Sequence, residues 1–159
     1  MSTRSGDLDP GAITYIGRRE QMSADALEDL LSHRAGLLAI SGKSGDMRVL
    51  QADEAHDPAS ALAVAIYAYS VKKAIGALAA ALGGIETLVF SGGIGEHAPA
   101  IRARICDGLA FLGIVVDPAR NAASAPIIST AAAPVAVRVI PTNEELMIAR
   151  AAYTLLGSR

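Results

Sequence analysis

Apolar positions are most regular in the second half of the chain, where two short runs each lead through a loop into a helix-like segment. One run ends "LVFSGG" and the other reads "VAVRVI" before "PTNEE". Isoleucine and leucine recur at helical spacing after the first run: Ile101, Ile105, Leu109 and Leu112. The pattern predicts two parallel strands joined by a right-handed crossover, with a helix over residues 98–112.

The segment after the second run predicts a terminal helix from about Thr142. Thr142 and Glu145 have the spacing of a capping box, which leaves Glu144 freer to reach a metal through water. Residues 114–117 suit a short strand and residues 118–134 a loop.

The first half has a weaker pattern. Residues 2–13 show no periodicity and are expected to form a loop. Ser23 suits the cap of a short helix that ends at Gly36, whereas the apolar residues 37–40 are too few to separate a strand from a helical turn.

Residues 58–82 form one long apolar segment, which we interpret as a largely buried helix of a soluble protein. Lys72 and Lys73 interrupt it, and each would cost about 3 kcal/mol at the centre of a membrane. Asp57 suits the amino-terminal cap, and Gly83 suits the stop.

Composition narrows the class of protein. The net charge of -2 disfavours a nucleic-acid partner or an anionic membrane surface. The chain is 52% hydrophobic but only 4% aromatic, so its core is expected to consist of Ala, Leu, Ile and Val. The single cysteine, Cys106, excludes an internal disulfide, and the amino terminus does not resemble a secretory signal, so we expect a cytoplasmic protein. Two strands are few for a parallel sheet, which indicates part of an α/β domain.

Two loops follow the carboxyl ends of the predicted strands, where open α/β sheets bind ligands. They are residues 91–97, "SGGIGEH", and residues 141–145, "PTNEE". Glycines allow a ligand to approach the backbone, although they equally suit a tight turn. Carboxylates at the start of a helix suit a metal site or simple capping. Both alternatives stay open on spacing alone.

Other residues also have two readings. The stretch "GLLAISGKSGD" resembles a phosphate-binding loop, but Gly36 precedes Gly42 by one position too many, so Lys43 is expected to be solvated. Arg4 suits a surface arginine or an anion ligand. Asp46 and Arg48 suit a solvated pair, and Cys106 a packed thiol.

Five ordered blocks together resemble one family. They are "TRSGDLDPG", "SGKSGDMR", "FSGGIGEH", "IRARICDGLAFLGI" and "VIPTNEELMIAR". In order and spacing they are similar to the carboxyl-terminal part of the acetate kinase family, over essentially the whole chain. The resemblance implies an α/β fold: an incomplete ribonuclease-H-like, actin-like ATPase domain with a parallel βαβ core and flanking helices. It also implies Mg²⁺-dependent phosphoryl transfer between ATP and acetate, giving acetyl phosphate and ADP.

The resemblance assigns roles to nine residues. Arg4 matches an arginine that neutralises the transferring phosphoryl group, and Glu144 matches a glutamate associated with magnesium. The remaining seven match contacts to the nucleotide: Asp46, Met47, Arg48, Gly93, Ile94, Gly95 and His97. His97 replaces the family's usual asparagine, which puts the nucleotide preference in question, and Val49 stands where aspartate is common.

The resemblance covers only part of the family's chain. Residues 1–141 are expected to be the nucleotide-binding domain without its first strands, and residues 142–159 a helix that packs on an absent amino-terminal domain. A homodimer supported by residues 58–82 is expected. Alternatives are a propionate or butyrate kinase, a truncated dimerisation module without activity, and a subunit completed by a separate chain.

Overall fold

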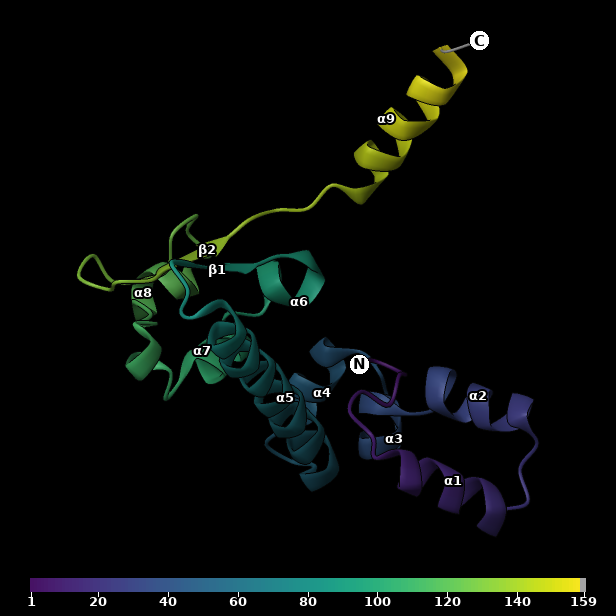
Figure 1. Cartoon of the computed structure of the whole chain (residues 1–159). Helices are drawn as coiled ribbons and strands as arrows, with labels where there is room; N and C mark the ends of the chain where they lie inside the picture. Colours follow the sequence, from purple (N-terminus) through teal and green to yellow (C-terminus); the bar gives the residue numbers. More distant parts are fainter. Residues whose placement is uncertain (158–159) are drawn as a thin grey trace. The chain divides into compact units, whose positions relative to one another are not determined.

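The computed structural model describes residues 1–157, which form two compact units (Figure 1). The first unit is Met1–Lys73, and the second begins at Ala74. Helix α5 (Pro58–Leu82) contains the boundary, so the chain passes from one unit to the other inside a helix.

The first unit is helical. Before α5 it contains four helices: α1 (Pro10–Arg19), α2 (Ala24–His33), α3 (Gly36–Ser41) and α4 (Met47–Asp53). Ser23 caps α2 as predicted, by accepting a hydrogen bond from the Ala26 N–H. The prediction of a loop over residues 2–13 is wrong from Pro10 onward, because Asp9 caps α1 and proline suits the first helical position.

The amino-terminal segment is fixed by main-chain hydrogen bonds to the α2–α3 region. The Leu37 N–H donates to the Met1 carbonyl at 2.9 Å, and the Ala35 N–H donates to the Thr3 carbonyl at 2.8 Å. The Ser5 N–H donates to the Leu31 carbonyl at 2.9 Å. These bonds hold the backbone on both sides of Arg4.

Helix α5 has the predicted ends. Asp57 accepts the Ser60 N–H at 3.0 Å, and Gly83 leaves the helix with φ of 76°. Among the described residues it is the one helix long and apolar enough to cross a membrane, and 22% of its most apolar stretch is buried. Burial is therefore smaller than predicted and follows one stripe: Ser60, Ala63, Val64, Ala68, Ile75 and Ala79.

The second unit contains the predicted parallel strand pair. Strand β1 (Thr87–Phe90) pairs with β2 (Ala136–Val139), with Thr87 opposite Ala136 and Phe90 opposite Val139. Between them lie α6 (Gly92–His97), α7 (Pro99–Cys106), the 3-10 turn η1 (Ala110–Leu112) and α8 (Pro118–Ala122).

The connection between the strands differs from the prediction in two places. The helix expected over residues 98–112 ends at Cys106, because Gly108 takes the left-handed φ of 75°. The loop expected over residues 118–134 begins with α8, since Asp117 caps it by accepting the Arg120 N–H. The short strand expected over residues 114–117 is reduced to one isolated bridge.

The free side of β2 is partly covered by the chain just before it. The Ile128 N–H donates to the Val137 carbonyl at 2.8 Å, and the Val139 N–H donates to the Pro126 carbonyl at 3.2 Å. Within the described sheet, β1 is therefore the strand with an open edge.

Branched aliphatic side chains dominate the core of the second unit, as the composition predicts. Its buried members include Ile101, Ile105, Leu109, Ile114, Ile128, Val135, Val137 and Val139. The core thus combines residues of α7, of the segment before β2 and of β2 itself. The loops that follow the two strands begin at the surface.

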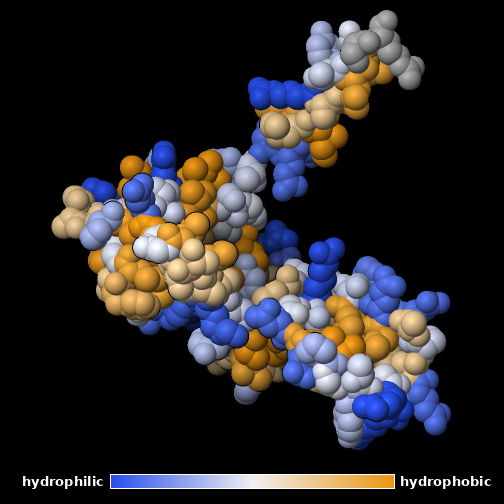
Figure 2. Space-filling model, viewed as in Figure 1, coloured by the Kyte–Doolittle hydropathy of each residue, from blue (hydrophilic) through white to orange (hydrophobic). Residues whose placement is uncertain are grey.

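Helix α9 (Glu144–Gly157) is exposed along its length. Its apolar side chains reach the surface together with its charged ones (Figure 2). The most exposed of the large apolar residues are Ile148, Tyr153, Leu155 and Leu156, at 69 to 80%. The described part of the chain therefore leaves these four side chains largely open to solvent.

Candidate functional site

The two predicted ligand loops begin side by side in the second unit. Because β1 and β2 are parallel, their carboxyl ends meet at one edge, and the Ile140 N–H donates to the Phe90 carbonyl at 2.9 Å. The first segment was expected to be an irregular loop, but it folds into the six-residue helix α6. The second loop leads into α9.

Glu96 joins these two segments. Its Oε1 accepts hydrogen bonds from the Gly92 N–H at 2.7 Å, the Thr142 N–H at 3.0 Å and the Thr142 hydroxyl at 3.1 Å. The side chain is 12% exposed. Hydrogen bonding from the Thr142 N–H is the main cause that lowers the pKa of Glu96 below its usual range. The group is therefore a carboxylate at neutral pH.

The capping box predicted for α9 is wrong. Thr142 donates to Glu96, and the helix is capped by Asn143, whose Oδ1 accepts the Leu146 N–H at 2.9 Å. The helix consequently begins at Glu144, two residues later than expected. Glu145 has no capping role.

Arg102 supports α6 from the core. Its guanidinium is fully buried, and its five N–H groups meet five acceptors at 2.7 to 3.0 Å. The acceptors are the carbonyls of Gly95, Glu96 and Asn121, the Asn121 Oδ1 and the Ser124 hydroxyl. Burial lowers the pKa of Arg102 below its ordinary value. Every donor is satisfied, so this charge is a structural clamp and not a free anion site.

The predicted glycine-loop residues differ in what surrounds them. A Cβ on Gly93 would meet no atom within 4 Å, so this position is open. A Cβ on Gly95 would lie 3.2 Å from the Phe90 carbonyl carbon, so this glycine allows α6 to pack on the end of β1. Ile94 is partly buried, and the His97 side chain is 79% exposed.

The other predicted nucleotide contacts lie in the first unit. Arg48 and Asp46 form the predicted pair, with 2.6 Å between Nη2 and Oδ2, and hydrogen bonding from Arg48 lowers the pKa of Asp46 to about 2. Asp46 also caps α4. The Met47 side chain is 3% exposed and packs in the core, so an accessible contact from this residue would come from its main chain.

Arg4 has an exposed side chain on a fixed backbone. Main-chain bonds at Thr3 and Ser5 hold the segment, and the Thr3 hydroxyl donates to the Ser32 carbonyl at 3.1 Å. Within the described residues the Arg4 guanidinium makes no hydrogen bond or ion pair. Arg4 therefore presents an exposed positive charge on a backbone that is fixed by hydrogen bonds.

Lys43 is exposed, as the sequence predicts, and it forms two ion pairs at the surface. Its Nζ lies 3.0 Å from an Asp53 carboxylate oxygen and 2.9 Å from an Asp57 oxygen. The hydrogen bonds that Lys43 donates to Asp57, and then to Asp53, raise the pKa of Lys43. The lysine of the motif that resembles a phosphate-binding loop therefore connects the end of α4 to the cap of α5.

Glu144 is the predicted metal-associated residue. It is exposed, and it makes no hydrogen bond or ion pair with other residues that the structure describes. Residues 1–157 contain no group of three or more His, Cys, Asp or Glu side chains placed for a metal. One free carboxylate fits Mg²⁺, which keeps several waters and is commonly held by one or two carboxylates plus substrate phosphates.

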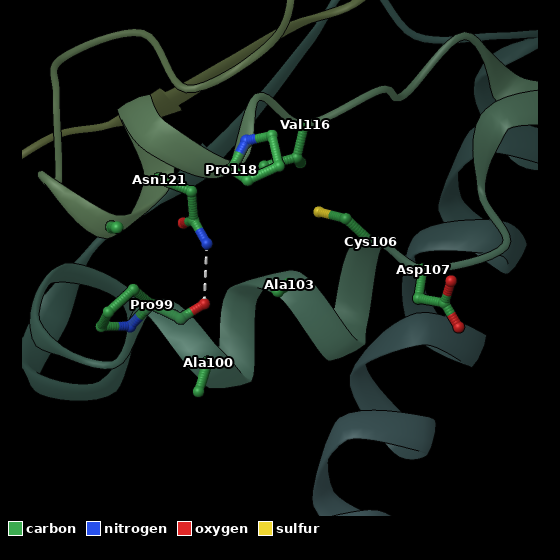
Figure 3. A pocket seen from close by; sticks show the side chains of 9 residues that line it. Pro99, Ala100, Ala103, Cys106, Asp107, Val116, Pro118 and Asn121 are labelled. Atoms are coloured by element: carbon green, nitrogen blue, oxygen red, sulfur yellow. Dashed lines mark hydrogen bonds between the residues drawn. The ribbon is translucent and has the colours of Figure 1, made fainter.

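A separate hollow of about 520 Å³ lies between α7 and α8 (Figure 3). Apolar side chains and the buried Cys106 line it, and the Asn121 amide donates to the Pro99 carbonyl at 2.8 Å. None of the predicted site residues lines this hollow. The packed-thiol interpretation of Cys106 agrees with its 6% exposure.

Sequence reasoning missed Glu96 and Arg102. Glu96 reads as a solvated residue after glycines, and its partner Thr142 is 46 positions away. Arg102 reads as the charged side of a helix. The one usable signal was the place of Glu96 in the segment that follows the first predicted strand, where polar residues often face a ligand site.

The chain is similar over nearly its whole length to proteins of one family. The family model described as the acetokinase family matches residues 1–150. Acetate kinase of Rhizobium meliloti is 52% identical over 153 residues, which are 96% of this chain and 38% of that protein. The chain thus spans about two fifths of the length of the curated relatives that it matches.

Solved structures agree in fold. The crystal structure of Porphyromonas gingivalis acetate kinase matches with a TM-score of 0.91 at 39% identity, over 98% of this chain and 40% of that one. A propionate kinase from Francisella tularensis subsp. tularensis matches with a TM-score of 0.85 at 37% identity, over 93% of this chain and 38% of that one.

Proposed function

The chain belongs to the acetokinase family, and from that premise we propose that it is the carboxyl-terminal, nucleotide-binding portion of an acetate kinase. The complete enzyme would transfer a phosphoryl group reversibly between ATP and acetate, giving acetyl phosphate and ADP. The observation that carries the proposal is the pair of segments at the carboxyl ends of β1 and β2, joined through Glu96, with an open glycine and a free carboxylate on them.

Phosphoryl transfer depends on positioning and on stabilising charge at the transferring group. We assign the charge-stabilising role to Arg4, whose guanidinium is exposed on a fixed loop. We assign nucleotide contacts to residues 46–48 in the first unit and to residues 93–95 and 97 in the second. Glu144 would hold Mg²⁺ through water, and the ion when bound supplies charge neutralisation on the nucleotide phosphates.

The division of the chain follows from the same proposal. Residues 1–141 would be the nucleotide-binding domain without its first strands. Residues 142–159 would form the helix that packs on an amino-terminal domain outside this sequence, for which the exposed apolar residues of α9 are the support. We place the protein in the cytoplasm, since its single cysteine suits a reducing compartment.

Two other functions have an observation in their favour. The 37% identity to a propionate kinase supports propionate as an alternative acceptor. Exposed apolar residues on α5, among them Leu62 and Leu78, favour a dimer contact, whether in an active enzyme or in a truncated module without activity. A separate chain that supplies the first half of the enzyme would be another protein partner.

Acetyl phosphate formation tests the proposal. We expect the chain alone to give no acetyl hydroxamate with ATP, Mg²⁺, acetate and hydroxylamine, because it holds only part of the site. A chimera in which this chain replaces the matching 153 residues of Rhizobium meliloti acetate kinase should give product. A folded chimera without activity would contradict the proposal. The same assay of this chain together with its native first half, with acetate and with propionate, would identify the acceptor.

Gly93 provides a test of the nucleotide site. Because a Cβ there meets no neighbour, Gly93→Leu should fold normally in the chimera but weaken Mg·ADP binding about tenfold or more, equivalent to roughly 1.4 kcal/mol. Isothermal titration calorimetry measures the affinity. Gly76→Ala in α5, where a Cβ is equally unobstructed, is the control and should bind as the parent does. Unchanged affinity in Gly93→Leu would remove the glycine loop from the site.

A further inference from the structure

Glu96 is held at both its side chain and its main chain. Its carboxylate receives the three hydrogen bonds from Gly92 and Thr142, while its carbonyl accepts from Arg102 Nη1 at 2.9 Å and from the Ser124 hydroxyl at 3.2 Å. Since Arg102 is itself fully buried, the residue is connected directly to the core. Glu96 therefore has one defined position from which it can fix another segment.

The segment that it fixes is the one that leads to Glu144. Thr142 offers both its N–H and its hydroxyl to Oε1, and Asn143 follows as the cap of α9. Only Asn143 separates the residue that contacts Glu96 from the first residue of the helix. Nothing else in the described residues bonds to the Thr142 side chain, so the contact with Glu96 sets where this segment leaves the sheet.

The carboxylate is already committed to these contacts. Its Oε1 carries all three hydrogen bonds, and its Oε2 lies 4.0 Å from His97 Nε2. A carboxylate with this arrangement acts by holding donors in place, in the way that groups behind a metal ligand orient it. It differs in this from Glu144, which is exposed and unbonded.

We propose that Glu96 is a positioning residue that ties the glycine segment 91–97 to residues 142–143 and thereby sets the place of Glu144 relative to the nucleotide loop. This inference rests on the proposed function for the role of Glu144. The link itself is a property of this chain and is tested without any nucleotide.

Amide hydrogen exchange in the chain tests the link. In Glu96→Ala, the Thr142 and Gly92 amides should exchange at least about tenfold faster, while the amides of β2 keep their protection. Glu96→Gln should be intermediate, because an amide oxygen still accepts hydrogen bonds but without the charge. Glu86→Ala, at an exposed glutamate just before β1, is the matched control and should leave Thr142 protected. Unchanged exchange at Thr142 in Glu96→Ala overturns the proposal.

The magnesium requirement of the active chimera tests the positioning role. Glu96→Ala should raise the Mg²⁺ concentration for half-maximal activity about tenfold, with little change in kcat at saturating Mg²⁺. Glu144→Ala should do the same, and Glu96→Ala should add nothing further in the Glu144→Ala background, because it acts through that residue. Independent, additive effects overturn the positioning role. An inactive parent chimera contradicts the proposed function instead, and the exchange experiment still decides the link.

Discussion

Arg102→Met is expected to lower the free energy of unfolding of the second unit by about 4 kcal/mol. Methionine fills much of the same volume but donates no hydrogen bond, so the carbonyls of Gly95, Glu96 and Asn121 lose the Arg102 donors, while Glu96 keeps the Ser124 hydroxyl. A hydrogen bond to a charged group contributes more than a neutral one, and an unsatisfied buried acceptor carries the full desolvation penalty.

Urea-dependent amide exchange at Val139, the last residue of β2, and at Ile140 just after it would measure this loss, because it reports the second unit by itself. Arg102→Lys keeps the charge but has three donors on one nitrogen, so it should fall between the parent and Arg102→Met. Arg104→Met, on the exposed side of the same helix, removes the same charge and should change stability by less than about 1 kcal/mol. Equal unfolding of Arg102→Met and the parent would show that the five bonds contribute no net stability.

Gly36→Ala is expected to detach the amino-terminal segment from α3 and to destabilise the first unit by about 3 kcal/mol or more. The added Cβ would lie 2.1 Å from the Met1 carbonyl oxygen and 2.6 Å from the Arg4 carbonyl oxygen. Both atoms belong to the main chain: the Met1 carbonyl accepts from Leu37, and Arg4 follows Thr3, whose carbonyl accepts from Ala35, so moving this segment away disturbs both hydrogen bonds. The glycine also has the left-handed φ of 62°.

Gly42→Ala separates the clash from the backbone strain. Gly42 has a similar φ of 69°, but a Cβ there meets nothing within 4 Å, so only the strain of about 1–2 kcal/mol applies. Amide exchange at Ala35 and Leu37 should become fast in Gly36→Ala and stay slow in Gly42→Ala. If both variants behave alike, the close approach of the Met1 carbonyl is not what requires glycine. In the chimera, Gly36→Ala should also reduce activity, since the displaced segment carries Arg4.

Local signals in the sequence account for the parts of the fold that were predicted correctly. The two parallel strands follow from their apolar runs, and the ends of α5 follow from Asp57 and Gly83. The likeness to acetate kinase structures confirms the predicted fold class. Each of these features depends on residues within a few positions of one another, which is the range over which a pattern is informative.

The incorrect predictions have physical causes of two kinds. The helix over residues 98–112 was predicted too long because the regular spacing of apolar residues continues past Gly108. That spacing does not show that Gly108 takes a left-handed conformation, which ends the helix. Thr142 was assigned to a capping box because it has the spacing, yet a carboxylate 46 residues away competes for both of its donors. The ion pair of the exposed Lys43 with Asp53 was missed because the helix that brings Asp53 to it was not predicted. Tertiary partners decided these cases.

The candidate site was predicted in its location more than in its construction. Glycines after one strand and glutamates after the other were identified, and both segments do follow the carboxyl ends of paired strands. Met47 shows the limit, because its burial follows from packing that the sequence does not display. Arg102 shows the opposite limit: it is a charged side chain that is buried, because all of its donors form hydrogen bonds, and the sequence does not display these partners either.

The open edge of β1 matters for any work with the chain in solution. Residues 87–90 read "TLVF", with neither charge nor proline, and the side chain of Val89 is 46% exposed. Natural sheets protect such edges with charges, prolines or covering segments, because an unprotected strand pairs readily with another molecule. The isolated chain should therefore form strand-paired aggregates more readily as its concentration rises, and a lysine at Val89 is the natural gatekeeper to engineer for soluble preparations.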